Sequence, residues 1–191
     1  MIEVGAAFSS TYAEARIKFL EAAAIAGLQI NSFNHPLLGK DGETLAMDTA
    51  LQLPASGKAS DKLLILSSAC HGVEGYCGSG VQTYALHDAE WLAHARAHDV
   101  TVLYIHALNP YGFSHIRRTT HENVDLNRNF HDFSKPLPVN AAYREVAEML
   151  MPDHWPPNAD NMALLQAYIA KHGEFAIQSA VSGGQHEYPK G

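Results

Sequence analysis

The sequence predicts an α/β protein, and two observations carry that prediction. The segment 62–68 contains a continuous apolar run, which is typical of a strand buried on both faces of a sheet. A glycine-rich turn, a helical pattern at 80–97 and a second buried-type strand at 100–106 follow in that order. Because this is the order of a parallel βαβ unit, any active crevice is expected beyond the carboxyl ends of the two strands.

The first segment of the chain predicts a helix with marked ends. Residues 11–26 carry a broad apolar stripe at helical spacing. Thr11 and Glu14 have the spacing of a capping box, and Gly27 lies where a left-handed C-terminal cap is needed. We therefore expect the helix to begin after Thr11 and to end before Gly27.

The remaining strands and helices are predicted from the spacing of apolar and polar residues. Residues 28–33 and 44–51 alternate between apolar and polar side chains, as strands do. Residues 107–137 are long, polar and mostly unpatterned, and such stretches in compact domains are usually functional or disordered. Helical patterns resume at 139–150 and 159–179.

The composition excludes several classes of protein. The 191 residues match one ordinary domain and show no linker or repeat, so we expect a single domain over residues 1–191. The 20 acidic and 13 basic side chains argue against a nucleic-acid binder, which needs a basic face. No apolar run approaches the roughly 18 residues of a membrane span, and the N-terminus lacks the basic region of an export signal. We therefore expect a cytoplasmic protein with no nucleic-acid and no membrane partner, whose oligomeric state the sequence does not indicate.

The metal-binding residue types give a mixed signal. Cys70 and Cys77 are too few for a disulfide scaffold and have no zinc-finger spacing, so we expect reduced thiols. The 12 histidines are many for a chain of this length and suggest a metal site, although a count locates none.

One histidine and glutamate pair has the context of a metal site. His71 and Glu74 follow the strand at 62–68, and two such residues three apart in a tight turn can both reach one ion. A catalytic zinc takes three protein ligands and keeps its fourth position for water. His87 and Glu90 have the same spacing, but they lie in a helical pattern and are interpreted as a solvated helix face.

A second group of candidates lies in the segment 116–130, which reads IRRTTHENVDLNRNF. A planar guanidinium can hold a substrate carboxylate through two parallel hydrogen bonds, or it can face an oxyanion that develops in a transition state. The alternative interpretation is a loop held together by ion pairs of Arg128 with Asp125 or Asp132.

Taken together, these motifs resemble the zinc carboxypeptidase family in order and spacing. The resemblance rests on HGVE at 71–74, on NPYGF at 109–113, and on Arg118 ahead of the NRNF segment at 127–130. In particular, the chain is similar to the bacterial, uncharacterised DUF2817-like branch, which carries paired arginines and an NVDLNRNF segment.

The matching stretch covers residues 62–130, and Gly184-Gln185 with Pro189-Lys190-Gly191 resembles a further short motif of that branch. The resemblance implies a three-layer α/β/α fold with a mixed, largely parallel central sheet, of which this chain holds a part.

The resemblance also implies a role for each matching residue. His71 and Glu74 would be two of the three ligands of zinc, which is the expected cofactor. Arg118 would polarise the scissile carbonyl and stabilise its oxyanion. Asn127 and Arg128 would bind the free carboxylate of a peptide or acyl amino-acid substrate. The implied reaction is metal-assisted hydrolysis of an amide bond next to that carboxylate.

The chain departs from the family pattern near its end. That pattern continues with a third ligand, a His on a later strand, and with a glutamate that acts as general base. Neither motif is present, so we expect the domain to lack its C-terminal portion. His186 is separated from Glu74 as a third ligand could be, but its surroundings match the non-ligand motif better, and Glu187 is a weaker candidate for the base. If no other group supplies these functions, we expect weak zinc binding or none, and no hydrolysis.

Three interpretations stay open at this point. The first is a zinc-dependent, metallocarboxypeptidase-like hydrolase. The second is an N-acyl amino-acid deacylase of the aspartoacylase type, which shares a His-x-x-Glu loop and an Asn-Arg pair. The third is a non-catalytic remnant that acts as a binding or scaffold domain.

Overall fold

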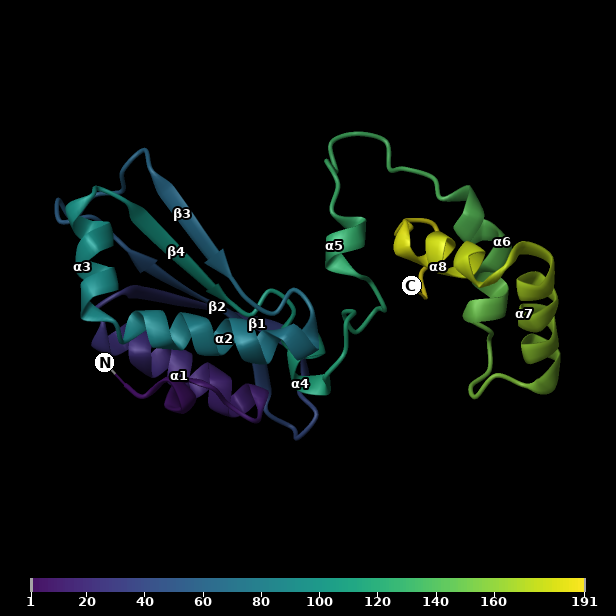
Figure 1. Cartoon of the computed structure of the whole chain (residues 1–191), viewed down its shortest axis with the longest axis horizontal. Coiled ribbons are helices and arrows are strands. Elements are labelled where there is room, and N and C mark those ends of the chain that lie inside the picture. The colour runs from purple at the N-terminus through teal and green to yellow at the C-terminus, as the bar shows by residue number, and fades with distance from the viewer. Residues whose placement is uncertain (1, 191) are drawn as a thin grey trace. The chain divides into compact units, whose positions relative to one another are not determined.

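The computed structural model of the chain describes residues 2–190, so that Met1 and Gly191 lie outside the described residues. The chain forms two compact units, residues 1–120 and residues 121–191, and each is described by itself. Figure 1 shows the sheet of the first unit and the helices of both. The α/β class is confirmed, because helices flank one mixed β-sheet.

The sheet of the first unit has four strands in the order β1-β2-β4-β3. Strands β3 and β4 pair in parallel, as the βαβ order predicts, whereas β1–β2 and β2–β4 are antiparallel. The sheet is mixed, but parallel pairing is less frequent in it than expected. A short turn joins β1 to β2, and only antiparallel strands can be joined in that way. The strands are β1 (Gln29–Leu38), β2 (Thr44–Gln52), β3 (Leu63–Ser67) and β4 (Thr101–His106).

The first helix begins and ends where the sequence predicts. The Thr11 side chain accepts a hydrogen bond from the Glu14 N–H at 3.2 Å, and Gly27 follows the helix with φ +69°. The reciprocal bond of the capping box differs, because the Glu14 carboxylate accepts from the Ser10 N–H at 2.9 Å. The helices of this unit are η1 (Val4–Ala7), α1 (Tyr12–Ile25), α2 (Gly72–Leu86), α3 (Ala89–Ala97) and α4 (Pro110–His115).

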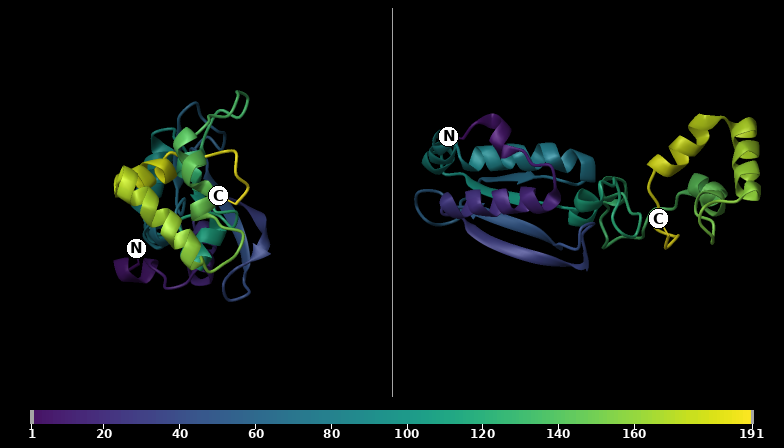
Figure 2. Two further views of the ribbon diagram at one scale, coloured as in Figure 1. Left: turned by 90° about the vertical axis from the view of Figure 1, so that its right-hand side faces the viewer. Right: turned by 90° about the horizontal axis from the view of Figure 1, so that it is seen from below.

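Helices α1, α2 and α3 pack on one face of the sheet. Phe19, Leu86 and Leu92, one from each helix, share a buried cluster with Ala50 of β2 and Tyr104 of β4. Figure 1 and the right-hand view of Figure 2 show α1 and α2 running side by side. This shared cluster joins the parallel strand pair to the helices and forms the main core of the unit.

The opposite face of the sheet is open to solvent. Phe33, Leu63 and Ile65 are 56%, 56% and 52% exposed, and by register they lie on the face away from Ala50 and Tyr104. Within the described part of this unit the sheet thus carries one helical layer, whereas the expected three-layer architecture has two.

The second unit is helical. Helices α6, α7 and α8 surround a small core of Tyr143, Val146, Ala147 and Ala180. The predicted helix over 159–179 is divided at Gly173, whose φ of +83° ends one helix and starts the next. The helices are α5 (Leu126–Asn129), α6 (Ala141–Leu150), α7 (Ala159–His172) and α8 (Glu174–Ser182). Among residues 2–190, no helix combines the length and the apolar character that crossing a membrane requires.

A polar contact lies inside the core of the first unit. His106, the last residue of β4, is fully buried; its Nε2 is 2.9 Å from the Ser79 Oγ of α2, and its ring stacks on Phe19. Asp48, its register partner on β2, is also fully buried and forms an ion pair with Arg16 at 2.7 Å. Burial lowers the pKa of His106 to about 4, because the imidazolium form would lose its hydration.

This buried imidazole predicts a stability that falls in acid. The unfolded chain takes up a proton on this side chain near pH 6.5, whereas the folded protein does so near pH 4. Stability present above pH 6.5 is therefore lost as the pH falls towards 4. His106 accounts for a loss of about 3 kcal/mol over that range. In His106→Gln, the free energy of unfolding should change less between about pH 7 and about pH 4.5 than in the parent.

Urea unfolding followed by Trp91 fluorescence in a Trp155→Phe background measures the first unit, because the chain has two tryptophans. His154→Gln is the matched control: His154 is exposed and belongs to the second unit, so this variant should keep the parent's pH dependence. Equal pH dependence in His106→Gln and the parent would contradict the prediction.

Candidate functional site

The loops that follow β3 and β4 are hydrogen-bonded to each other at the carboxyl end of the parallel strand pair. The Leu108 N–H donates to the Ser68 carbonyl at 3.0 Å, and the Asn109 N–H donates to the Ala69 carbonyl at 2.9 Å. Ala69 is buried and has a φ of 55°, which a non-glycine residue adopts only when its surroundings hold it. The two loops therefore form one rigid edge of the sheet, where the sequence predicts the crevice.

Helix α2 begins directly after His71. The expected glycine-rich turn is in fact the start of the helix, with His71 as N-cap residue and Glu74 in the first turn. Glycine has a low helix propensity, which explains the prediction of a turn, but tertiary packing overrides propensity here. Both residues stay close together, because the N-cap and the first turn of a helix are contiguous.

Gly72 is the position at which α2 meets the turn after α4. Its N–H donates to the Arg117 carbonyl at 2.9 Å. A Cβ at this position would lie 1.9 Å from the Gly112 carbonyl oxygen and 2.4 Å from that of Arg117. Only glycine allows this approach of two backbones.

Helix α4 turns the chain so that Arg117 and Arg118 reach the start of α2. The Asn109 side chain caps the helix by accepting from the Gly112 N–H at 2.8 Å. Ile116 ends it in the left-handed conformation, with φ 54°, and the Arg117 N–H then donates to the Gly112 carbonyl at 2.8 Å. The NPYG motif is thus a capped, short helix, which the sequence indicates only as a turn.

His71 and Arg118 are joined through the backbone of the arginine. The His71 Nδ1 lies 3.3 Å from the Arg118 carbonyl oxygen. Because a carbonyl oxygen can only accept, Nδ1 carries the hydrogen and the lone pair of the neutral ring is on Nε2, the form in which a ring nitrogen can bind a metal. Glu74 is exposed and forms no ion pair among the described residues. His71, Glu74 and Arg118 therefore belong to one local arrangement in the first unit.

A complete metal site is not found in this arrangement. Residues 2–190 contain no group of three or more His, Cys, Asp or Glu side chains placed to hold a metal ion. His71 and Glu74 are two suitable donors, and a catalytic zinc needs three.

Asn127 and Arg128 lie on the short helix α5 of the second unit. Asp125 caps this helix, because its carboxylate accepts from the Asn127 N–H at 3.0 Å. Among residues 2–190, no carboxylate forms an ion pair with Arg128, and Asp132 instead pairs with Lys135 at 3.0 Å. The alternative interpretation, in which Arg128 pairs with Asp125 or Asp132, is therefore wrong for these residues.

The two motifs of the second unit are joined by Asn129. Its side chain donates to the Asp125 carbonyl at 2.9 Å and accepts from the Gln185 N–H at 2.8 Å. Gly184 has a φ of +69°, and a Cβ on it would lie 2.4 Å from the Arg128 carbonyl oxygen. The backbone at Arg128 is thus fixed by the segment that begins at Gly184.

His186 and Glu187 make other contacts within this unit. The His186 ring lies 6.3 Å from the ring of His131 and 6.4 Å from that of Phe133, measured between centroids. Glu187 forms an ion pair with Arg144, whose hydrogen bonds lower the pKa of the carboxyl group. A general base at neutral pH needs a pKa near the working pH, so this pairing does not favour Glu187 as the base.

Cavities of the second unit include one beside Arg128 and one beside Tyr143. The Arg128 cavity, of about 290 Å³, is lined by Arg128, Phe130, His131, Pro138, Val139, Asn140, Ala141, Ala142, Ser179, Gly183, Gly184 and His186. The Tyr143 cavity, of about 520 Å³, is lined by Tyr143, Ala147, Glu148, Met151, Pro152, Asp153, His154, Asn161, Tyr188, Pro189 and Lys190.

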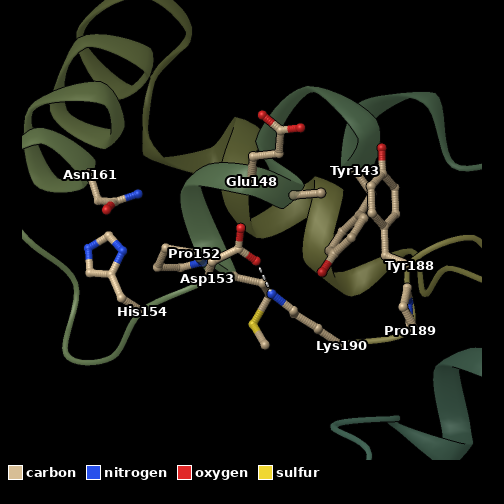
Figure 3. Close-up of a pocket in the computed structure, with 11 residues that line it drawn as sticks. Tyr143, Glu148, Pro152, Asp153, His154, Asn161, Tyr188, Pro189 and Lys190 are labelled. Atoms are coloured by element: carbon tan, nitrogen blue, oxygen red, sulfur yellow. Dashed lines mark hydrogen bonds and ion pairs between the residues drawn. The ribbon is translucent and has the colours of Figure 1, made fainter.

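The larger cavity has acidic side chains in its wall. Figure 3 shows the rings of Tyr143 and Tyr188 next to each other and the Asp153 carboxylate beside the Lys190 ammonium group. Glu148 also lines this cavity. Lys190 neutralises Asp153, so the like charge that a carboxylate substrate would meet here comes from Glu148, which makes the Tyr143 cavity a poor candidate for its binding.

Some of these residues have no signal in the sequence. The bridging role of Asn129 depends on a partner 56 residues away. For His106 the sequence carries a partial signal, because residues two apart in a strand share a face and this places His106 with Val102 and Tyr104.

Gly72→Ala should lower the free energy of unfolding of the first unit by about 3 kcal/mol, because the new Cβ meets two backbone oxygens that cannot move independently. Gly5→Ala is the matched control, since a Cβ there meets nothing within 4 Å. Urea unfolding of both variants measures the difference. Similar free energies of unfolding of the two variants would show that the surroundings of Gly72 can accommodate a Cβ.

A comparison with curated proteins finds no match. A family model with the description "Protein of unknown function (DUF2817)" matches residues 8–191, which is nearly the whole chain. The matched region includes the start of α2, the turn after α4, and both segments that Asn129 joins. The chain therefore belongs to the DUF2817 family.

Proposed function

We propose that the protein is a carboxypeptidase-like, zinc-dependent hydrolase that cleaves an amide bond next to a free carboxylate. The observation that carries the proposal is the start of α2 against the turn after α4. There His71, Glu74 and Arg118 lie at the carboxyl end of the parallel strand pair, where ligands of open α/β sheets bind.

In this proposal His71 and Glu74 are two protein ligands of the metal. The bond from His71 Nδ1 to the Arg118 carbonyl supports that role, because metal-binding histidines usually donate their other ring N–H to a carbonyl or carboxylate. The metal, when bound, would acidify a water molecule and polarise the scissile carbonyl. His71 and Glu74 alone give incomplete coordination, so the proposed activity also requires a third ligand and a general base from other groups.

Arg118 is proposed to donate to the oxyanion that develops on the carbonyl oxygen. The contacts of residues 112 and 117 with the start of α2 fix the backbone next to it. The Cα atom of Arg118, from which the side chain extends, is therefore held in place. Fixed donors at a developing charge are among the larger contributions to catalysis.

Asn127 and Arg128 are proposed to bind the free carboxylate of the substrate. The absence of an ion pair at Arg128 within residues 2–190 supports this, because a guanidinium that is not neutralised by the protein can take a carboxylate through two hydrogen bonds. The same chemistry would serve an N-acyl amino-acid deacylase, which differs in the acyl group that it releases.

Zinc binding tests the first part of the proposal. The protein should bind zinc weakly, with less than one ion retained after dialysis, because two ligands hold zinc less well than three. His71→Ala should abolish this binding. His87→Ala is the matched control, since His87 has the same spacing to a glutamate but lies at the end of α2. Calorimetric titration with zinc chloride measures both, and unchanged binding in His71→Ala would exclude His71 as a ligand.

Kinetics test the role of Arg118. Peptides and N-acyl amino acids with a free carboxylate are assayed with zinc in excess. Arg118→Ala should lower kcat by roughly 10²-fold or more, as expected for loss of an oxyanion donor. Arg117→Ala, one residue earlier, should have a much smaller effect. An unchanged kcat in Arg118→Ala would remove that side chain from the mechanism, and no hydrolysis of any substrate would overturn the proposed activity.

A further inference from the structure

The Arg128 cavity is lined by potential cations and contains no acidic side chain. Arg128 comes from α5, His131 follows that helix, and His186 comes from the segment after α8. Each imidazole can donate a hydrogen bond and becomes positively charged on protonation, which a bound carboxylate favours. The chemical character of the wall therefore matches an anionic group.

The carboxylates next to His131 and His186 in the sequence are paired with other residues. Asp132 pairs with Lys135, and Glu187 pairs with Arg144. The Tyr143 cavity differs in that it is lined by Glu148, which forms no ion pair among residues 2–190, whereas Asp153 in the same wall is paired with Lys190. An anionic group would therefore meet a like charge in the Tyr143 cavity but not in the Arg128 cavity.

The two imidazoles lie close enough to act on one group. Their ring centroids are 6.3 Å apart, so a single carboxylate beside the two rings can contact both. The His131 Nε2 is 3.3 Å from the Pro136 carbonyl and donates to it, so Nδ1 is the nitrogen left for a ligand, and it donates only in the imidazolium form of this ring. Phe130 and Val139 add apolar surface to the same cavity, against which methylene groups can pack.

The segment that holds His186 is fixed to the segment that holds Arg128. Asn129 accepts from the Gln185 N–H, and Gly184 lies directly against the Arg128 carbonyl. The Asn140 side chain donates to the Gly184 carbonyl at 2.7 Å, which holds the same segment at the start of α6. The guanidinium and the second imidazole therefore extend from one cross-linked backbone, which lowers the entropic cost of ordering them around a ligand.

We propose that the Arg128 cavity selects substrates whose terminal residue has an acidic side chain. Arg128 binds the main-chain carboxylate of that residue, and His131 and His186 bind its side-chain carboxylate. This inference rests on the proposed function for the role of Arg128, and it adds the substrate class and two residues that determine it.

Direct binding tests the inference with three probes that share an N-acetyl group and a free carboxylate. They are N-acetylglutamate, its neutral isostere N-acetylglutamine, and N-acetylnorleucine. Calorimetry should give about tenfold tighter binding of N-acetylglutamate than of the other two, because hydrogen bonds to a charged group are the stronger ones. Equal affinities for the glutamate and glutamine probes, or no binding of any probe, would overturn the inference.

Variants locate the binding. His186→Gln and His131→Gln should each weaken N-acetylglutamate binding by about fivefold or more and leave N-acetylglutamine binding unchanged. His154→Gln is the matched control, because His154 lines the Tyr143 cavity. Circular dichroism confirms that each variant is folded. A loss of selectivity in His154→Gln, with none in the other two, would place the acidic subsite elsewhere and reject the inference.

The two proposals fail in different ways. If N-acetylglutamate binds selectively through His186 but no amide is hydrolysed with zinc in excess, the proposed activity is contradicted and the proposed selectivity of the cavity is supported. If amides are hydrolysed with equal kcat/KM for glutamate and glutamine ends, the activity stands and the acidic preference is rejected.

Discussion

The backbone contact between Gly72 and the turn at residues 112–117 determines the geometry of the candidate site. Strand β3 leads into α2, and strand β4 leads into α4, so the contact joins the two connections that leave the parallel strand pair. A hydrogen bond of 2.9 Å and an approach that excludes a Cβ leave little freedom between them. His71 and Arg118 each lie one residue from this contact, and the bond between them follows from it.

A similar principle operates in the second unit. A Cβ on Gly184 would lie 2.4 Å from the Arg128 carbonyl oxygen, compared with 1.9 Å between a Cβ on Gly72 and the Gly112 carbonyl oxygen, and Asn129 adds two hydrogen bonds. In both units a glycine lies beside a candidate functional residue and joins it to a distant segment. The motifs that the sequence resemblance singles out thus serve first to hold backbone segments together, and their polar side chains extend from positions fixed in this way.

The sequence predicts the parts of this fold that depend on the local spacing of apolar residues. The helix after Thr11, the strands β3 and β4 and their parallel pairing follow from patterns within a few residues. The start of α2 is missed, because the close contacts that its glycines allow, such as that of Gly72 with the turn after α4, cannot be read from the sequence. The open face of the sheet is missed as well, since a continuous apolar run indicates burial on both faces. Long-range packing decides both features.

Only part of the candidate site can be predicted from the sequence, for the same reason. The pairing of His71 with Glu74 is local, and their spacing is visible in the sequence. The roles of Asn129 and Gly184 require knowledge of a contact between segments more than 50 residues apart. The difference between Arg128, which has no acidic partner among the described residues, and Asp132, which has Lys135, depends on side-chain geometry that no spacing rule provides.

The bond between His71 and residue 118 has a consequence for how this site can diverge. Because the acceptor is the carbonyl oxygen of residue 118, any amino acid at that position offers it. The orientation of the His71 imidazole therefore depends on the path of the backbone and not on the guanidinium of Arg118. A descendant of this protein could exchange the arginine and lose its chemistry while the ring kept its direction, so ligand binding and catalysis can be separated by a single substitution in evolution.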